Sequence, residues 1–342
     1  LYQLPQTFAI DTAIALDKVV GEYDTWNLAA VKDAMTKLQD GATVFDVYRT
    51  KSDILSTCIS RNIDAFVDWE NGAAHFDSDE FKALLEFANS FPDTYDWENA
   101  DEEDQDSAQN RMNAGKQLMS SFYVSSLEDI LYQLTGYNGK VKFVGYPSED
   151  GTSNHAFQIN GAIGISSTCA DKTAAWNFMK QFLNEEYQSS YNIWSFPINQ
   201  NAFDAKLKKM MTEEYQTDEN GNVMKDDNGN PIRIPKVTYY TDGSGNMTGY
   251  STGNGGVAVM EASADGTTVS ENGEVNVYAM TQEQADEILG LINATTAVYG
   301  YDESIMGIIT DEAAPYFAGE KSIDDTVSMI QSRVNLYVAE QS

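Results

Sequence analysis

The order of strand-like and helical stretches constrains this chain more than any single motif. Residues 140–146 and 157–166 are short apolar runs with strand character, and amphipathic stretches with apolar residues at helical spacing precede and follow them. Strands that alternate with helices in this way are typical of an α/β protein with a mainly parallel sheet. We therefore expect an α/β fold, and the length of 342 residues favours two domains.

Three helices illustrate how the limits are predicted. One is expected to follow Thr25, whose side chain would cap it. Another is expected to begin after Ser78, because a capping serine there precedes an acidic first turn. Residues 168–192 carry apolar residues on one face and predict a single long helix.

The strands are harder to delimit. Residues 1–12 predict an extended segment, a turn at Pro5, and then a second strand or the start of a helix. Residues 64–69 form a short apolar run that predicts a strand.

Residues 217–280 differ in character from the rest of the chain. Asn-Gly and Gly-Asn pairs alternate there with strand-like runs, which predicts a β-hairpin insertion. The sequence D-x-N-G-N occurs at Asp218 and again at Asp226, and closely spaced carboxylates and amides are also the oxygen ligands of calcium. Because the EF-hand order of ligands is missing, we favour hairpin turns over a calcium loop.

The charge of the chain excludes some classes of partner. The 53 acidic and 21 basic residues give a formal net charge of −32, which repels nucleic acid and anionic lipid surfaces. The acidic residues are spread along the chain and predict a solvated surface. No apolar run is long enough to predict a membrane-spanning helix.

Few residues are suited to thiol, imidazole or cofactor chemistry. Cys58 and Cys169 lack the spacing of a zinc site, and we expect two free thiols, with one disulfide as the alternative. His75 and His155 are expected at the surface or in loops. Gly161 lies after a predicted strand but outside any G-x-G-x-x-G motif, so we expect no cofactor and no metal.

Aromatic residues gather at the ends of predicted elements, where residues that contact ligands concentrate. Each of them would also suit an ordinary core. They are Phe8, Tyr123, Tyr146, Trp194, Tyr299 and Tyr301.

The ordered series of segments resembles a known family. LYQLPQTF, TWNLAAV, SRNIDAFVDWENGAAHFDSDEFKALLEFANSFP and NAGKQLMSSFYVSS are followed by FVGYPSEDG, INGAIGISSTCADKTAAWNFMKQFLNEEYQ, FPINQNAF and APYFAGEKSIDDTVSMIQSRVNLYVAE. Together they are similar to the extracellular solute-binding proteins of ABC sugar importers, family 1, the group that contains maltose-binding protein. The resemblance covers most of the chain outside 217–280. The strand-helix-strand units that precede YQLP in that family have no counterpart in this sequence.

The resemblance implies a two-lobe, periplasmic-binding-protein-like (type II) α/β fold with a β-hairpin insertion and an incomplete N-terminus. The implied organisation is 1–11, hinge crossing and end of lobe 1; 12–155, lobe 2; 156–200, return to lobe 1 and hinge; 201–216, a helix of lobe 2; 217–280, the hairpin insertion; and 281–342, the C-terminal helices of lobe 2.

The resemblance also implies a function. Such a protein captures a carbohydrate, here expected to be an oligosaccharide, by hinge closure and delivers it to the membrane permease of an ABC importer. We expect a binding protein without enzymatic activity, and a monomer. The resemblance also implies a cell-surface lipoprotein whose signal segment lies outside this chain. The alternatives are a glycoside-acting enzyme with a carboxylate pair in a cleft, and a binding protein for a polyamine or a peptide.

The residues expected to bind the ligand combine rings that stack on a sugar with short polar groups that reach its hydroxyls. They are Gln6, Thr7, Phe8, Ser121, Tyr123, Tyr146, Asn160, Trp194, Tyr299, Tyr301 and Asp302.

Overall fold

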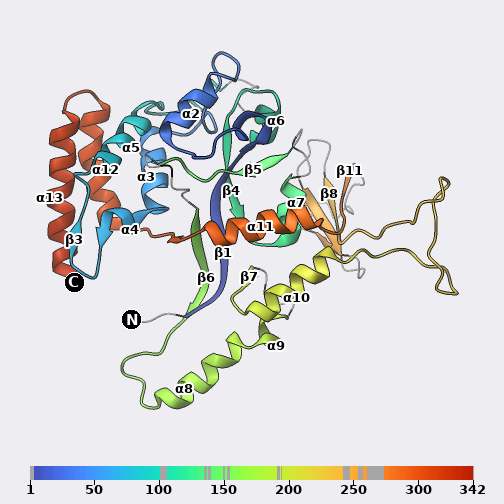
Figure 1. The fold of residues 1–342 in the computed structure, drawn as a ribbon. Helices are drawn as coiled ribbons and strands as arrows, with labels where there is room; N and C mark the ends of the chain where they lie inside the picture. Colours follow the sequence, from blue (N-terminus) through green and yellow to red (C-terminus); the bar gives the residue numbers. More distant parts are fainter. Residues whose placement is uncertain are drawn as a thin grey trace. The chain divides into compact units, whose positions relative to one another are not determined.

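The chain divides into two compact units in the computed structural model, and each is described by itself (Figure 1). Unit 1 comprises residues 1–8, 124–136 and 160–290, and unit 2 comprises residues 9–123, 137–159 and 291–342. The structure describes residues 4–100, 106–134, 137, 140–148, 151, 155–190, 193, 195–241, 247–252, 257–259 and 273–341.

Unit 2 contains a sheet with helices around it. Strands β1 and β6 run on into unit 1, and β4 ends at the boundary. The elements are β1 (Leu4–Leu16), α1 (Asp17–Val20), α2 (Leu28–Met35), α3 (Lys51–Ser60), α4 (Ile63–Phe66), β2 (Val67–Asp68), β3 (Ala73–Ala74), α5 (Asp79–Asn89), α6 (Ala108–Asn113), β4 (Met119–Val124), β5 (Val141–Phe143), β6 (Ala156–Ile163), β12 (Ala297–Val298), α12 (Glu303–Phe317) and α13 (Ile323–Gln341).

The sheet of unit 2 is built around β1, in the order β12-β6-β1-β4. Strand β12 is parallel to β6, with Ala297 opposite Ala156, whereas β5 is antiparallel to β1, with Phe143 opposite Ile14. The prediction of an α/β fold is confirmed, but the sheet is mixed in direction. Apolar periodicity locates a strand without fixing its direction, which explains the difference.

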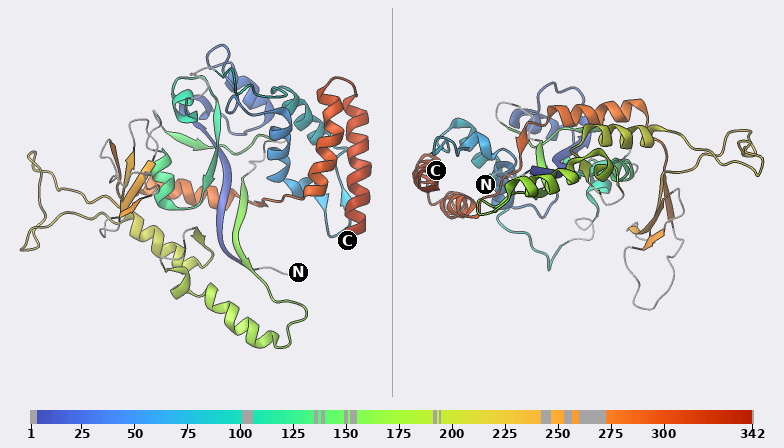
Figure 2. Two further views of the ribbon diagram at one scale, coloured as in Figure 1. Left: turned by 180° about the vertical axis from the view of Figure 1, so that it is seen from behind. Right: turned by 90° about the horizontal axis from the view of Figure 1, so that it is seen from below.

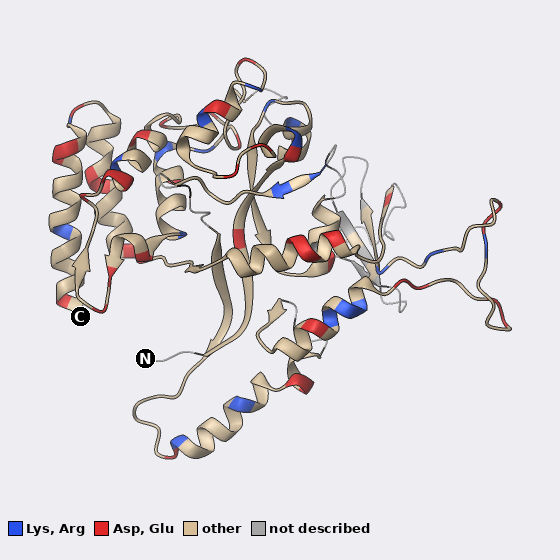
Figure 3. Ribbon diagram, viewed as in Figure 1, with Lys and Arg blue, Asp and Glu red and all other residues tan. Residues whose placement is uncertain are grey.

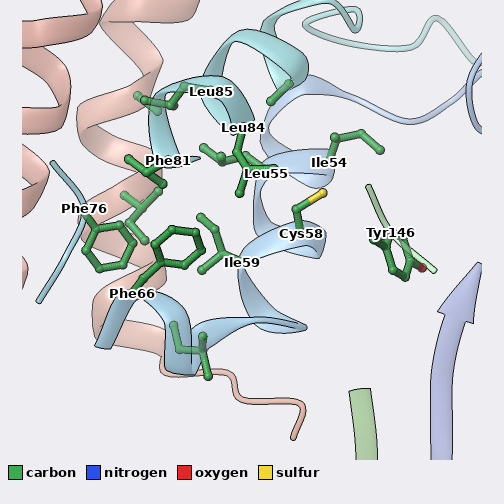
Figure 4. Close-up of a cluster of buried hydrophobic side chains, with 14 of the residues drawn as sticks. Ile54, Leu55, Cys58, Ile59, Phe66, Phe76, Phe81, Leu84, Leu85 and Tyr146 are labelled. Carbon is green, nitrogen blue, oxygen red and sulfur yellow. The ribbon is translucent and has the colours of Figure 1, made fainter. Parts of the chain in front are cut away.

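The core of unit 2 lies between α3, α5 and the C-terminal helices. Figure 4 shows Leu55 and Ile59 of α3 facing the side chains of α5, beside the stacked rings of Phe66 and Phe76, whose centroids are 5.4 Å apart. Helices α12 and α13 lie side by side in both views of Figure 2. Ile309 of α12 belongs to this cluster. Burial of these apolar side chains is the main source of stability of the unit.

Unit 1 holds the remaining helices and a second sheet. Its elements are α7 (Leu127–Leu134), α8 (Lys172–Met179), a 3-10 helix η1 (Lys180–Leu183), α9 (Glu185–Gln188), β7 (Phe196–Pro197), α10 (Gln200–Met211), β8 (Val237–Thr241), β9 (Met247–Thr252), β10 (Val257–Val259), β11 (Gly273–Val277) and the first part of α11 (Gln282–Ala294).

The predicted β-hairpin insertion is confirmed in unit 1. Strands β10, β9, β8 and β11 form an antiparallel sheet in that order. Residues 212–236, here called the arm, precede β8 and extend away from α10 and the sheet in Figure 1. In the arm, the amide of Gln216 donates to the carbonyl of Ile232 at 2.9 Å, and Tyr215 pairs with Arg233 in an antiparallel bridge.

Both D-x-N-G-N sequences form closed turns in the arm. The Asp218 carboxylate accepts from the amides of Asn220 and Asn222 at 2.9 Å and from Asn222 Nδ2 at 3.0 Å. Asp226 accepts the corresponding bonds from Asn228 and Asn230. The hairpin-turn interpretation is therefore confirmed, because the carboxylate oxygens serve the turn itself.

Two predicted strand limits are wrong. Residues 4–16 form one continuous strand in which Pro5 lies near the start, a position that tolerates a residue without an amide hydrogen. Residues 64–69 do not form one strand, since a helical turn, Ile63–Phe66, precedes the two-residue strand β2. Burial of Phe66 among apolar neighbours suits either backbone conformation.

The helix predictions need corrections at their ends. Ser78 caps α5 as expected, through its hydroxyl and the amide of Phe81 at 3.2 Å. Helix α2 is capped by Asn27 rather than Thr25. The long helix predicted over 168–192 is divided into α8, η1 and α9, because Asn184 is extended and accepts from the amide of Tyr187 at 2.8 Å, which begins a new helix.

Both cysteines are free, as expected, and Cys58 is buried. His75 is exposed, and His155 lies in a non-strand position as the loop alternative predicts, but it is buried rather than at the surface. His155 precedes β6, is 4% exposed, and its Nδ1 lies 2.6 Å from the Thr12 hydroxyl of β1. Burial lowers the pKa of His155 to about 4, so the ring is neutral at pH 7.

The two units group some segments differently from the implied lobes. Residues 201–216, assigned to lobe 2 by resemblance, lie in α10 and the start of the arm, which belong to unit 1. The first part of α11 also belongs to unit 1. The lobe boundaries themselves stay a prediction.

Acidic residues are spread over the helices and loops of each unit (Figure 3). Within the described part of the chain, no helix is long and apolar enough to cross a membrane. Nor does that part contain a group of His, Cys, Asp and Glu side chains arranged to hold a metal ion.

The paired turns of the arm permit a test with an internal control. The hydrogen bond from the Asn222 side chain is the largest cause that lowers the pKa of Asp218 below its ordinary value of 3.8. The folded pKa of Asp218 lies below its unfolded pKa. These bonds therefore stabilise the turn at pH values above 3.8, and their contribution is lost as the pH falls through the folded pKa. Asn222→Ala should raise the pKa of Asp218 toward 3.8, measured by carboxyl NMR titration.

Asp226 serves as the control in the same spectra, since its own partner Asn230 is unchanged. Its pKa should stay lowered in the variant. An unchanged Asp218 titration in Asn222→Ala would show that the side-chain bond does not hold this turn.

Candidate functional site

Arg61 is the centre of a polar network in unit 2. It follows α3 as its C-cap, its Nη2 donates to Asp11 Oδ2 at 2.6 Å, and its Nη1 donates to the Thr57 carbonyl at 2.9 Å. The guanidinium carbon lies 4.4 Å from the ring centroid of Tyr146 and 5.7 Å from that of Tyr299. One side chain therefore ties α3 to the central strand β1 and to two rings predicted for the site.

The Arg61–Asp11 ion pair is largely buried. The exposed fractions of the two side chains are 13% and 9%, and Gln158 Nε2 of β6 donates to the same Asp11 oxygen at 3.3 Å. A buried carboxylate needs such partners, because its transfer from water is otherwise unfavourable. The network thus connects α3, β1 and β6.

Tyr146 packs against the Arg61 guanidinium of this network. It is fully buried, its ring is stacked on Phe45 at a centroid distance of 5.7 Å, and its hydroxyl donates to Ser121 Oγ at 2.8 Å. Burial raises the pKa of Tyr146 to about 12. The expectation that this ring faces a ligand is corrected: no face of it is open, and it holds Arg61 and Ser121 in place.

An open groove lies in unit 2 between the N-terminal halves of α3 and α12. Its volume is about 520 Å³, which falls in the range of small-molecule sites. Its wall is formed by hydroxyls, carboxylates, a phenol ring, a thioether and the backbone of α12 at Gly307. The lining residues are Thr50, Ser52, Asp53, Ser56, Tyr301, Glu303, Met306, Gly307, Thr310 and Asp311.

The lining offers one aromatic ring beside hydroxyls and carboxylates that accept hydrogen bonds. Tyr301, predicted for the site, is 58% exposed and presents its ring to the groove. Asp53 is paired with Arg49, whose Nε lies 2.9 Å from its carboxylate, so part of the negative charge is compensated. An aromatic face beside short hydrogen-bonding groups can bind a molecule with one apolar face and several hydroxyls.

Gly307 shapes the groove. It lies inside α12, where glycine is about 1 kcal/mol less favourable than alanine. A Cβ at this position would meet nothing within 4 Å, so packing does not require glycine there. A side chain would instead project into the groove that the residue lines.

The other predicted residues of unit 2 have varied roles. Tyr123 is 42% exposed at the end of β4. Tyr299 is half-buried, and its amide donates to the carbonyl of Phe157 at 2.9 Å. Asp302 caps α12, since its Oδ1 accepts from the amide of Ile305 at 2.9 Å, and its Oδ2 accepts from the Tyr337 hydroxyl. Its carboxylate is therefore engaged in holding the helix.

The segment from Tyr299 to Tyr301 is held close to α3. The amide of Gly300 donates to the carbonyl of Ser60 at 2.9 Å. A Cβ on Gly300 would lie 2.5 Å from Ile63 Cγ2, so only glycine allows this approach. The close passage places Tyr299 over Arg61 and Tyr301 at the groove.

The predicted residues of unit 1 lie together in a separate group. Thr7 donates to the carbonyl of Asn160, and Asn160 Nδ2 donates to Ser195 Oγ at 3.1 Å. The Phe8 ring lies 5.3 Å from that of Phe196, on the strand that pairs with it. Trp194 lies outside the described residues.

Gln6 completes the unit 1 group. Its carbonyl accepts from Nε2 of the buried Gln188 at 2.9 Å. Its side-chain oxygen lies 3.3 Å from the position of a Cβ on Gly161. The strands β1 and β6 thus bring Gln6 and Thr7 beside Asn160.

Sequence reasoning missed Arg61, Asp11 and the groove residues of α3. A signal for Asp11 existed, because a single carboxylate in the apolar run FAIDTAIAL requires a buried partner. Ser52 and Ser56 stand four residues apart and so share a helix face. Nothing in the local sequence links them to α12.

Comparison with known proteins identifies the fold. No protein-family model matches the chain, and no curated protein matches its sequence. The sugar-binding protein MalE from the phytopathogen Xanthomonas citri is 12% identical with a TM-score of 0.53, over 99% of this chain and 71% of that one. The cyclic alpha-maltosyl-1,6-maltose binding protein from Arthrobacter globiformis is 12% identical with a TM-score of 0.51, over 99% and 72%. The chain has the α/β periplasmic-binding-protein fold of these MalE-like proteins.

The buried ion pair of unit 2 predicts a large effect of mutation. Arg61→Leu leaves the Asp11 carboxylate buried without its cation, and the free energy of unfolding should fall by about 3 kcal/mol. Denaturant unfolding followed by circular dichroism measures the change. Adding Asp11→Asn should restore part of the loss, because the stranded charge is then removed.

An exposed ion pair provides the control. Lys82 and Asp324 lie 2.7 Å apart with side-chain exposures of 33% and 78%. Lys82→Met should change the free energy of unfolding by less than about 1 kcal/mol. Equal losses in Arg61→Leu and Lys82→Met would contradict the role given to the buried pair.

Proposed function

We propose that this protein binds a carbohydrate, an oligosaccharide, and delivers it to the membrane permease of an ABC importer. It works as a binding protein rather than as an enzyme, outside the cell and anchored to its surface. The observation that carries the proposal is the MalE-like fold, which extends over 99% of the chain in two known sugar-binding proteins.

The groove of unit 2 supports a sugar as the solute. The ring of Tyr301 stacks on the C–H face of a pyranose, and the hydroxyls of Thr50 and Ser56 and the carboxylate of Glu303 bond to sugar hydroxyls. Tyr123, Tyr299 and the Gln6–Thr7–Asn160 group of unit 1 are proposed as further ligand contacts. A strongly acidic chain repels phosphorylated or carboxylated ligands, so the sugar is a neutral one.

Capture by hinge closure is proposed as the mechanism. The chain passes from unit 1 to unit 2 within β1, after Phe8. It enters unit 1 at the end of β4, after Tyr123, and is again in unit 2 from Tyr137. It passes from unit 2 to unit 1 once more within β6, after Ile159. It passes back within α11, after Gly290. A few backbone dihedral changes in these segments are enough to move two α/β units as rigid bodies.

Binding is tested directly by calorimetry. The protein is titrated with linear malto-, cello- and chito-oligosaccharides, and with spermidine and a mixed tripeptide as the alternative solutes. We expect heat and a raised melting temperature with at least one neutral oligosaccharide series. Parallel assays for new reducing ends should stay flat over hours.

Two outcomes would contradict the proposal. Release of reducing ends would identify a glycoside-acting enzyme, and binding of spermidine or the peptide in place of every sugar would identify another class of solute. Absence of binding to all probes would also count against it.

Gly307 provides a test of the groove. Gly307→Ala should raise the free energy of unfolding by about 0.4–1 kcal/mol, because the unfolded chain loses freedom. Gly307→Leu should weaken binding of the oligosaccharide found by calorimetry about tenfold, since its side chain fills the groove. Ser332→Leu is the control, because Ser332 is exposed on α13 and does not line the groove.

Ser332→Leu should leave the affinity unchanged, because the added side chain lies outside the groove. If Gly307→Leu binds the oligosaccharide as tightly as the original protein, the ligand does not occupy the groove.

A further inference from the structure

Three aromatic residues of unit 2 form an exposed stack, here called the aromatic platform (Tyr48, Tyr95 and Trp97). The rings of Tyr48 and Trp97 are stacked with centroids 5.6 Å apart, and Tyr95 meets Trp97 edge-on at 4.8 Å. Trp97 is 69% exposed and Tyr48 is 44% exposed. The platform is therefore ordered by its own ring contacts while its surface stays open to solvent.

The core of unit 2 does not need the platform. None of its residues belongs to the buried cluster described above or to the apolar side chains packed against it, within the described part of the chain. Exposed aromatic groups of this size mark binding sites, because a ring left in water gains nothing from folding. The platform is thus a surface that gains stability when a ligand covers it.

The platform is held beside the groove. The amide of Lys51, in the first turn of α3, donates to the carbonyl of Pro92 at 3.0 Å, and its Nζ lies 2.9 Å from Asp93. These bonds fix the loop that carries Tyr95 and Trp97 to the helix end whose Thr50 and Asp53 line the groove. Tyr48 precedes this helix end by two residues, so the platform and the groove adjoin.

The charges around the platform select its ligand class. Asp53 is paired with Arg49, Asp93 with Lys51, and Asp96 accepts from the amides of Glu98 and Asn99. Asp46 interacts with the Tyr48 hydroxyl, and Glu98 is exposed. The platform itself offers the ring faces of Trp97 and Tyr48. An anionic ligand is repelled by the net charge of −32.

We propose that the aromatic platform binds sugar units of an oligosaccharide beyond those held in the groove. This inference rests on the proposed function and extends it: the preferred solute is a longer oligosaccharide, whose distal pyranose rings stack on Trp97 and Tyr48. Affinity rises with chain length until the ligand spans both the groove and the platform.

The test compares chain lengths in one variant. Trp97→Ala is titrated with the disaccharide through the heptasaccharide of whichever series binds the original protein. We expect the affinity for the longest members to fall about tenfold and that for the shortest to change less than twofold. Trp97→Phe, which keeps a ring in the stack, should recover most of the loss.

Trp69→Ala is the matched control, because Trp69 is also an exposed tryptophan of unit 2, at 39%. It should leave the affinity for every chain length unchanged, and melting temperatures verify that all variants fold. If Trp97→Ala keeps the full rise of affinity with chain length, the platform proposal is overturned while the proposed function stands. If no saccharide of any length binds the original protein, the proposed function fails first.

Discussion

The ion pair between Arg61 and Asp11 is the interaction on which the arrangement of unit 2 depends. It joins the end of α3 to the middle of β1, and through Gln158 it also holds β6. The rings of Tyr146 and Tyr299 pack on the guanidinium of Arg61. The segment that leads to α12 is therefore held against the same side chain. Once these elements are fixed, the N-terminal halves of α3 and α12 meet at the groove.

The candidate site combines a rigid support with an open surface. Tyr146 and Phe45 are buried and carry no free face, whereas Tyr301, Tyr123 and the aromatic platform are exposed. This division follows the general design of binding sites, in which packed side chains hold the contacting ones in place. The rings proposed to meet the ligand are thus different from the buried rings that support them.

Much of the fold could be predicted from the sequence, and the site only in part. Periodicity and turn chemistry located α5, β4 and the hairpin insertion, because those signals are local. The break at Asn184 and the burial of His155 depend on contacts with distant residues, and local patterns do not contain them. For the same reason Tyr301, which lines the groove, could be proposed from its place at the end of an element, whereas Arg61 and Ser56, whose partners lie far along the chain, could not.

The turns at Asp218 and Asp226 have a consequence for how the arm can change. Each turn satisfies its carboxylate with amides from the next four residues, and for that purpose it uses no hydrogen bond from the rest of unit 1. Such a segment can be duplicated or deleted as a whole without leaving a polar group stranded elsewhere. Each turn of the arm is therefore a self-contained unit of local structure.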